Sequence, residues 1–313
     1  MDLSLSIITI VLSTITIILS QRYFLHKKIV DNINHRSSHS SIATRSGGIA
    51  IFVSVFITSC FFYISGIEIY DFSLIIPLSL LALIGLYDDV YRLDFKLKFI
   101  FQIIAAKLLI DNGLIIDNLH GLFGIFELNR LIAQLLTIFI SLAIINSINF
   151  VDGVDGLAIT VVLLFILMFE LFVIQSTPYI NFSIVIICSI IPLYFYNFKK
   201  TNKVFLGDSG SLFLGGVVSI YTIFIFSQEY IIKERFDVNK IIFIISILTY
   251  PIIDMIRVVL IRIVNKKSPF QADKKHIHHF IISKTNNHFL TTLIILMSTL
   301  IVTLTIQLLN YIS

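Results

Sequence analysis

The sequence is poor in charge, because only 13% of its 313 residues are Asp, Glu, Lys or Arg, about half the share found in soluble domains. It lacks tryptophan and has two cysteines, Cys60 and Cys188, both inside apolar segments, which argues against a disulfide framework or a redox role. Hydrophobic residues make up 57% and the mean hydropathy is +0.96, values that exclude a disordered chain and an ordinary soluble enzyme. The apolar residues form unbroken blocks rather than alternating, which excludes a membrane β-barrel.

The fold class that remains is an all-α integral membrane protein. A spanning helix needs about 20 mostly apolar residues, and ten segments are candidates, of which the third is short and the fourth contains Lys107. They are 3–22, 47–64, 73–87, 98–116, 130–148, 157–176, 180–196, 212–228, 241–264 and 289–311. Because the loops between them are too small to fold alone, we expect residues 1–313 to form a single polytopic membrane domain.

Basic residues are distributed unevenly between the two sides of such a bundle. With ten spans, one set of loops and flanking helix ends carries 18 of the 23 lysines and arginines, and the opposite set carries 4. The positive-inside rule places the first set in the cytoplasm and both termini outside. The cytoplasmic loops are then 22–46, 88–98, 146–156, 197–211 and 265–288.

The loops assigned to the cytoplasm also hold nearly all of the unusual polar residues. These form five clusters: Asp88-Asp89; Asn146, Asn149, Asp152 and Asp155; Asp208 in GDSGS; Asp254 with Arg257; and Asp273 with His276, His278 and His279. Each cluster has an ordinary explanation by itself, such as a helix cap, a tight turn, a loop before a helix or a positive-inside signal. Acidic residues beside apolar spans are nevertheless costly, and they often mark a site.

The coincidence of five clusters on one face predicts a single site there. GDSGS can supply backbone N–H groups at a helix N-terminus, which suits an anion. The His-Ile-His-His run resembles a metal site, but no cysteine supports zinc, and the adjacent Lys274 and Lys275 favour an anionic ligand. Carboxylates, amides, imidazoles and cations together fit a divalent metal with phosphates, since Mg²⁺ binds carboxylate and phosphate oxygens.

Four of these segments together resemble the polyprenyl-phosphate N-acetylhexosamine-1-phosphate transferase family. They are DDVYRLDFKLKFIFQ, NSINFVDGVDGLA, VFLGDSGSLFLG and PIIDMIRVVLIRIVNKKSPFQADKKHIHHF. The resemblance covers about residues 35–280, and the motifs are specific in this order and spacing. The His-Ile-His-His form is closer to the branch that transfers GlcNAc-1-phosphate from UDP-GlcNAc to undecaprenyl phosphate. The phospho-MurNAc-pentapeptide translocase branch carries three consecutive histidines instead.

The resemblance implies three groups of functional residues. The catalytic group is Asp88, Asp89, Lys98, His276, His278 and His279. The substrate-binding group is Arg45, Asn146, Asp152, Asp155 and Phe205. The ligands of a Mg²⁺ cofactor, with Mn²⁺ as an alternative, are Asn149 and Asp208. In this scheme Asp88 activates the lipid phosphate, Lys98 contacts phosphate, Phe205 stacks on uracil and the histidines lie near the diphosphate.

One motif departs from the family pattern. Relatives often have His-x-x-Pro-x-Pro-Arg-x-Gly-Gly in the first cytoplasmic loop, whereas this chain has Ile42 and Thr44 at the two proline positions after His39. We expect the loop to be less rigid and its contact with a nucleotide sugar to be weakened. Because Arg45 and the two glycines remain, we expect activity to be retained.

The implied reaction transfers GlcNAc-1-phosphate, or the phosphate of a related N-acetylamino sugar, from a UDP-sugar to undecaprenyl phosphate. It releases UMP and starts a lipid-linked cell-surface glycan, such as an O-antigen of lipopolysaccharide or another cell-wall polymer. The implied partners are undecaprenyl phosphate, a UDP-N-acetylamino sugar and membrane lipid, with no nucleic acid, and a homodimer is plausible. The implied location is the bacterial cytoplasmic (inner) membrane, with several spans and an active site facing the cytoplasm.

Three other functions compete with this interpretation. The pentapeptide translocase is the closest, and the His-Ile-His-His form argues against it. A transporter is suggested by Lys107 and Glu170 inside predicted spans, but its polar clusters should lie near the membrane midplane rather than at the ends of the spans. An inactive scaffold should have lost its motif acids, and this chain keeps them.

Overall fold

The computed structural model describes residues 2–31, 43–121, 124–173, 177–199, 201–228, 238–268 and 275–312. His39, Ile42 and Asp273, which the sequence singles out, lie outside these ranges. The predicted all-α membrane fold is confirmed, since helices make up most of the described residues. The chain divides into two compact units, and each is described by itself: Met1–Leu108 with Ser176–Gly216, and Leu109–Gln175 with Val217–Ser313. The prediction of one domain stays a prediction.

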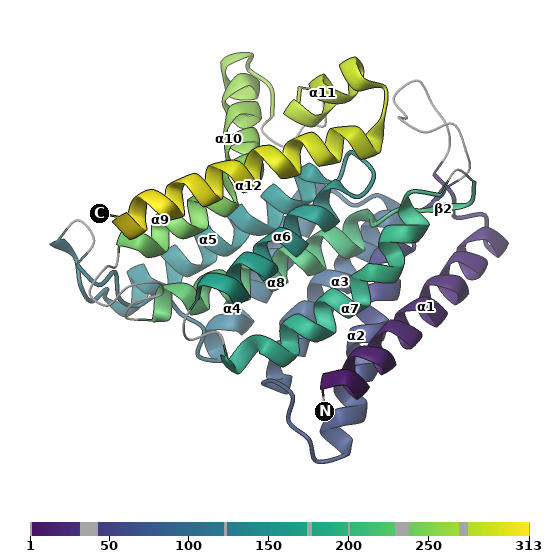
Figure 1. Ribbon diagram of the computed structural model, residues 1–313, viewed down its shortest axis with the longest axis horizontal. Coiled ribbons are helices and arrows are strands. Elements are labelled where there is room, and N and C mark those ends of the chain that lie inside the picture. Colours follow the sequence, from purple (N-terminus) through teal and green to yellow (C-terminus); the bar gives the residue numbers. More distant parts are fainter. Residues whose placement is uncertain are drawn as a thin grey trace. The chain divides into compact units, whose positions relative to one another are not determined.

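The first unit consists of helices and one very short sheet. Its helices are α1 (Asp2–His26), α2 (Gly47–Ile64), η1 (Phe72–Leu74), α3 (Ile75–Tyr91), η3 (Thr177–Tyr179) and α7 (Ile180–Asn197). α4 (Phe95–Asp111) and α8 (Gly207–Ser227) begin here and end in the second unit. β1 (Ala43–Thr44) and β2 (Lys203–Val204) pair in parallel. α1 packs along α2 and α7, as Figure 1 shows at its purple end.

Two glycines in the first unit allow helices to approach each other closely at the start of α8. A Cβ atom on Gly48 of α2 would lie 1.9 Å from the backbone nitrogen of Gly210. A Cβ atom on Gly85 of α3 would lie 2.4 Å from the backbone oxygen of Asp208. Real Cβ contacts are never this short, so only glycine permits the observed backbone packing. Gly85 lies one helical turn before Asp88 and Asp89, and its close contact therefore sets their distance from α8.

Replacing Gly85 with alanine is expected to push α3 away from the start of α8. Overpacking of this kind costs about 1–3 kcal/mol, and it also separates Asp88 and Asp89 from Asp208. We expect a lower thermal unfolding temperature in detergent together with a loss of activity. Leu83→Ala, on the exposed face of the same helix, is the control and should change neither strongly. Unchanged stability and activity in Gly85→Ala would contradict the close packing.

In the described part of the second unit, six helices lie wholly within it, in addition to the ends of α4 and α8. They are α5 (Arg130–Val151), α6 (Leu157–Phe172), α9 (Val238–Ile247), α10 (Thr249–Val264), α11 (Ile277–Thr285) and α12 (His288–Ile312). α12 packs on α6, α9 and α11, and α10 packs on α5. The short α11 begins directly after His276, so the histidine motif lies at the start of a helix that α12 supports.

The predicted single span 241–264 is wrong in one respect, because it consists of two helices. α9 and α10 are bent by 76° at a break around Leu248. Pro251 follows in the first turn of α10. Proline has no N–H, so it cannot donate to the carbonyl of Ile247, and a continuous helix would lose that bond. The first turn of a new helix tolerates proline because its N–H groups are unbonded there.

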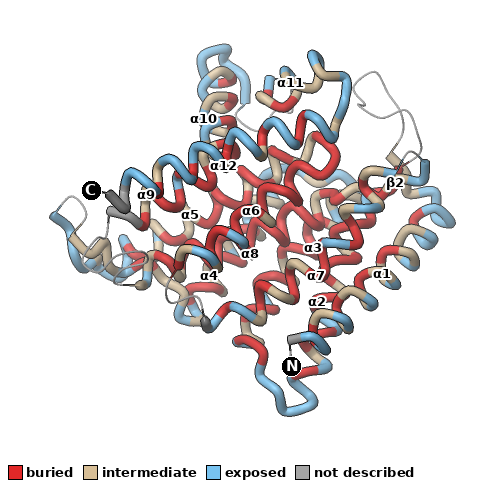
Figure 2. The backbone as a smooth tube through the Cα atoms, in the orientation of Figure 1, coloured by how far each residue is buried: buried red, intermediate tan, exposed pale blue. Residues whose placement is uncertain are grey.

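Most of the predicted spans coincide with helices suited to a membrane. In the part of the chain that the structure describes, seven helices are long and apolar enough to cross a bilayer, or eight if α9 and α10 form one broken span. The predicted count of ten is thus not confirmed, since α6 is shorter and α4 is short and charged. α8 is almost wholly buried, as its red colour in Figure 2 shows. α1 and α12 expose apolar side chains outward, as expected of helices that face lipid.

Candidate functional site

Lys98 joins two acidic residues in the first unit. Its Nζ lies 3.0 Å from Oδ2 of Asp88 and 3.0 Å from Oδ1 of Asp208. Asp88 comes from the end of α3, Lys98 from the first turns of α4, and Asp208 from the first turn of α8. The three side chains keep 14–25% of their surface exposed, so the cluster is sheltered but can still be reached. Three residues predicted to handle phosphate or metal therefore do meet.

The end of α3 explains how Asp88 is held. Arg92 adopts a left-handed conformation with φ of 57° and ends the helix. The chain then turns, and the backbone N–H of Leu93 donates to Oδ1 of Asp88 at 2.6 Å. One carboxylate oxygen is thus used to stabilise the turn, and the other is directed at Lys98. The same turn leads into α4, which places Lys98 ten residues after Asp88.

Asp89 has a different environment from its neighbour. Its two carboxylate oxygens accept the backbone N–H groups of Asp208 and Ser209, both at 2.9 Å. Gly207 has a φ of +71°, and a Cβ atom there would lie 2.7 Å from Oδ2 of Asp89. The sequence predicts an anion at the start of GDSGS, and the anion found there is this carboxylate. The contacts favour a role for Asp89 in fixing α8, and hence Asp208, over direct contact with a reacting group.

Backbone hydrogen bonds bring Arg45 and Phe205 into the same segment. The N–H of Phe205 donates to the carbonyl of Thr44 at 2.8 Å, and its own carbonyl accepts the N–H of Gly47 at 3.0 Å. The β1–β2 pair extends this contact. Arg45 also forms a 3.2 Å ion pair with Asp31 at the surface. Thr44 stands at one of the lost proline positions, and the backbone pairing there is intact.

In the second unit the loop after α5 carries Asp152 and Asp155, two of the predicted substrate-binding residues. α5 ends at Val151, and Gly156, with a φ of +73°, precedes α6. The backbone N–H of Asp155 donates to Nδ1 of His288 at 3.1 Å. The hydroxyl of Thr292 donates to the carbonyl of Asp155 at 2.9 Å. α12 therefore anchors this loop, and Asp155 itself is buried.

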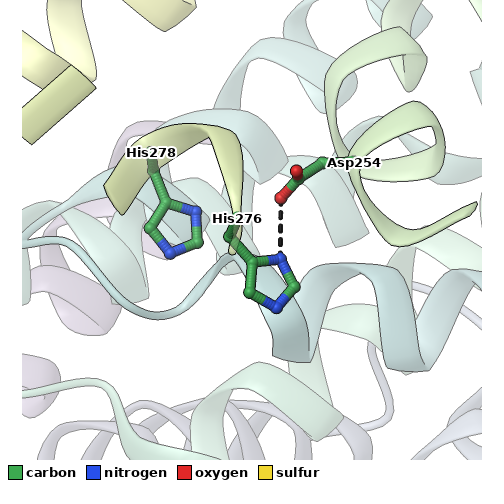
Figure 3. Close-up of side chains that lie close together, drawn as sticks. All are labelled: Asp254, His276 and His278. Atoms are coloured by element: carbon green, nitrogen blue, oxygen red, sulfur yellow. Dashed lines mark hydrogen bonds and ion pairs between the residues drawn. The ribbon is translucent and has the colours of Figure 1, made fainter. Parts of the chain in front are cut away.

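The histidine motif is held by α10; Figure 3 shows Asp254 of this helix paired with His276, and His278 beside it. Nδ1 of His276 lies 2.8 Å from Oδ2 of Asp254. The ring of His278 stacks on that of His276 with centroids 5.3 Å apart, and its Nδ1 lies 2.8 Å from the hydroxyl of Tyr250. His276 and His278 are buried, whereas His279 is partly exposed.

His278 is expected to make folding stability depend on pH. Burial, followed by the imidazoles of His279 and His276, lowers the pKa of His278 from 6.5 to about 3, and these causes outweigh the opposing charge of Asp254. The unfolded chain therefore takes up a proton near pH 6.5 that the folded chain refuses until about pH 3. Stability is full above pH 6.5 and falls as the pH drops through this window.

Thermal unfolding in detergent, compared between neutral pH and about pH 5, measures this effect. The unfolding temperature should fall at the lower pH, and His278→Gln should reduce the size of the fall. His26→Gln, which changes an exposed histidine, is the control and should leave the fall unchanged. An equal fall in the wild type and in His278→Gln would contradict the assignment.

Comparison with known proteins indicates the family to which the chain belongs. The glycosyl transferase family 4 model matches residues 71–226. A probable undecaprenyl-phosphate N-acetylglucosaminyl 1-phosphate transferase of Bacillus subtilis is 30% identical over 272 residues, covering 85% of this chain and 73% of the relative. The chain belongs to the polyprenyl-phosphate N-acetylhexosamine-1-phosphate transferase family.

Two further relatives of this transferase family member come from other bacterial groups. A decaprenyl-phosphate N-acetylglucosaminephosphotransferase of Mycobacterium leprae is 27% identical over 289 residues, covering 83% of this chain and 71% of the relative. An undecaprenyl-phosphate alpha-N-acetylglucosaminyl 1-phosphate transferase of Salmonella typhimurium is 27% identical over 282 residues, covering 86% of this chain and 73% of the relative.

The structure of this transferase family member groups the predicted residues within each unit. Asp88, Lys98 and Asp208 meet in the first. In the second, the 146–156 loop contacts the histidine motif, since a Cβ atom on Gly153 would lie 2.6 Å from Nε2 of His278. The sequence analysis noted Asp254 but assigned it no role, and it did not consider Tyr250 or His288. The position of Asp254, an acidic residue inside an apolar helix, was the sequence feature that could have indicated a function.

Proposed function

We propose that this protein transfers GlcNAc-1-phosphate, or the phosphate of a closely related N-acetylamino sugar, from a UDP-sugar to undecaprenyl phosphate. The observation that carries the proposal is Lys98, held between Asp88 and Asp208 at the ends of apolar helices. A fixed cation beside carboxylates suits a substrate with several phosphates. The names of the relatives, which specify N-acetylglucosaminyl phosphate transfer to a polyprenyl phosphate, favour this branch over the pentapeptide translocase.

In the proposed reaction an oxygen of the lipid phosphate attacks the phosphorus next to the sugar. A new P–O bond forms, the bond to the UMP oxygen breaks, and UMP leaves with the electron pair. Lys98 neutralises charge on the phosphates, and the two carboxylates hold its ammonium group in place. A lipid phosphate is already largely ionised near neutral pH. Asp88, whose oxygens are used by Leu93 and Lys98, therefore orients the cation rather than removing a proton.

The donor chemistry of the cluster fits the predicted Mg²⁺. Asp208 offers carboxylate oxygen, the hard ligand that Mg²⁺ prefers, and a quarter of its side chain is exposed. Asp208 and Asn149 are the proposed ligands, and the bound ion would supply further positive charge at the phosphates. Mn²⁺ has similar ligand preferences and is the proposed substitute.

A direct, single displacement is favoured over a covalent sugar-phosphate enzyme. Both oxygens of Asp89 accept backbone N–H groups, and both of Asp88 are held as well, so neither carboxylate is placed as a nucleophile. Incubation with a UDP-sugar carrying a ³²P label at the sugar-proximal phosphate, followed by denaturation, tests this choice. Label that stays on the denatured chain would require the two-step route.

Topology and partners belong to the same proposal. The apolar outer faces of α1 and α12 support a multi-pass protein in the bacterial cytoplasmic membrane. The distribution of basic residues supports a site that faces the cytoplasm, where UDP-sugars are made. The product would start a surface glycan such as an O-antigen, and the enzyme would act as a homodimer.

The test is UMP release by detergent-purified protein supplied with undecaprenyl phosphate, Mg²⁺ and a panel of UDP-N-acetylamino sugars. Asp208→Asn is the inactive variant, and Asp94→Asn, an exposed aspartate near the same cluster, is the matched control. Release that needs lipid and metal and is lost only in Asp208→Asn supports the transferase and names the sugar. Wild-type protein that releases no UMP with any sugar would overturn it and leave the transporter and scaffold alternatives.

A further inference from the structure

Asp254 lies at the centre of the contacts that hold the histidine motif. It comes from α10, is 1% exposed, and accepts three hydrogen bonds. The donors are Nδ1 of His276 at 2.8 Å, the backbone N–H of Ile277 at 2.9 Å and Nη2 of Arg257 at 3.0 Å. One carboxylate thus orients an imidazole and fixes the first backbone N–H of α11. Arg257 also donates to the carbonyl of Lys275, which ties the entry to the motif to the same point.

These contacts assign the tautomer of His276. Asp254 is an acceptor, so Nδ1 of His276 carries the proton. Nε2 then bears the lone pair, and Nη2 of the buried Arg262 lies 3.4 Å from it in a donating position. Arg262 in turn lies over the ring of Phe150, 5.5 Å from its centroid. Both nitrogens of the ring are therefore assigned, and the assignment depends on a carboxylate at position 254.

We propose that Asp254 is a positioning residue for the transferase reaction, which fixes the tautomer and orientation of His276 and through it the presentation of the histidine motif. The inference rests on the proposed function. Tyr250 lies four residues before Asp254 on the same face of α10, and its hydroxyl forms a hydrogen bond with Nδ1 of His278. A carboxylate that holds an imidazole in one tautomer is a recurrent device for making the other ring nitrogen available.

A metal ion is the competing explanation, because ligand atoms of Asp254, His276 and His278 lie within 4.8 Å of one another. The contacts argue against it. Oδ1 of Asp254 already accepts the guanidinium of Arg257 and the backbone N–H of Ile277, while Oδ2 pairs with Nδ1 of His276. A dication would also face Arg262 beside His276. Two guanidinium groups around a cation site are unfavourable, whereas they suit a carboxylate that receives donors.

The decisive experiment is a double-mutant cycle on UMP release. Asp254→Asn keeps the shape but offers an amide NH₂ to Nδ1 of His276, so it reverses the preferred tautomer. We expect kcat to fall about 10- to 100-fold with KM for the UDP-sugar changed less than about threefold. In a His276→Gln background the same substitution should cost less than about twofold, because the residue through which it acts is gone. Asp117→Asn, an exposed aspartate of the same unit, is the control.

Each outcome decides between the possibilities. Equal fold-losses from Asp254→Asn with and without His276 would show a merely structural role and overturn the proposal. Asp254→Glu keeps the carboxylate and should recover a large part of kcat, so equal losses in the Asn and Glu variants would also overturn it. An equimolar transition metal that wild type retains through desalting, and Asp254→Asn loses, would replace it with a metal site. If wild type itself releases no UMP, the proposed function fails instead.

Discussion

Replacing Lys98 with methionine is expected to lower the rate of sugar-phosphate transfer by about 1,000-fold. The substitution keeps an unbranched side chain, one atom shorter, but removes the cation between Asp88 and Asp208. The two carboxylates then face the substrate phosphates without an intervening positive charge, and repulsion replaces attraction. Lys98→Arg keeps the charge, but its planar guanidinium cannot place one nitrogen 3.0 Å from both acids in the same way, so we expect partial activity.

The same substitution two residues earlier provides the control. Lys96 lies on α4 and is exposed, so Lys96→Met changes net charge equally without touching the cluster. Rates of UMP release are compared for protein that elutes as a folded species in size-exclusion chromatography, since unpaired acids can also lower stability. Lys98→Met with more than about a tenth of wild-type activity would refute the central role of this lysine.

Replacing Asp89 with alanine is expected to reduce stability and activity together. Its carboxylate accepts two backbone N–H groups at the start of α8, and loss of a helix cap costs about 0.5–2 kcal/mol. Asp208 lies in that first turn, so its displacement should lower UMP release about 100-fold. Asp88→Asn should differ, because it removes charge beside Lys98 while leaving the α8 cap in place. Thermal unfolding and UMP release, measured on both variants, separate the two roles.

Asp71 offers a matched control for capping in general. Its side chain accepts the N–H of Ser73 at the start of η1, within the same unit. Asp71→Ala should lower the unfolding temperature slightly and leave the specific activity of the folded protein unchanged. Asp89→Asn, which retains one acceptor oxygen, should lie between wild type and Asp89→Ala. An Asp89→Ala variant as stable as wild type but inactive would instead support direct participation in the reaction.

Helix content and most of the apolar segments could be predicted because they depend on local composition. The beginnings of helices could not. The segment 212–228 was predicted from its apolar residues, yet α8 begins at Gly207. The first turn is polar and small, and it is helical because Asp89, more than a hundred residues earlier, accepts its N–H groups. A partner so distant in sequence leaves no mark on the local pattern.

The candidate site shows the same limit. Asp88, Lys98 and Asp208 were chosen from motifs, and the structure brings them together. The motifs do not reveal that Asp88 pairs with Lys98 whereas Asp89 accepts N–H groups of α8. The direction of each side chain depends on the packing of α3 against α8 at Gly85. Similarly, Asp254 was visible as an acid in an apolar segment. Its pairing with His276 could not be predicted, because it depends on the direction of α10 after the break that precedes Pro251.

The surface of α10 is inverted relative to a helix of a water-soluble protein. Tyr250, Asp254 and Arg262 face inward, while Ile253 and Leu260 are about half exposed on the outside. If α9 and α10 form one broken span, acyl chains would cover that outer face, on the helix whose inner face orients the imidazoles. We therefore expect the layer of lipid or detergent around α10 to influence the position of the histidines. A harsh detergent that removes it would misalign the histidines long before the bundle unfolds.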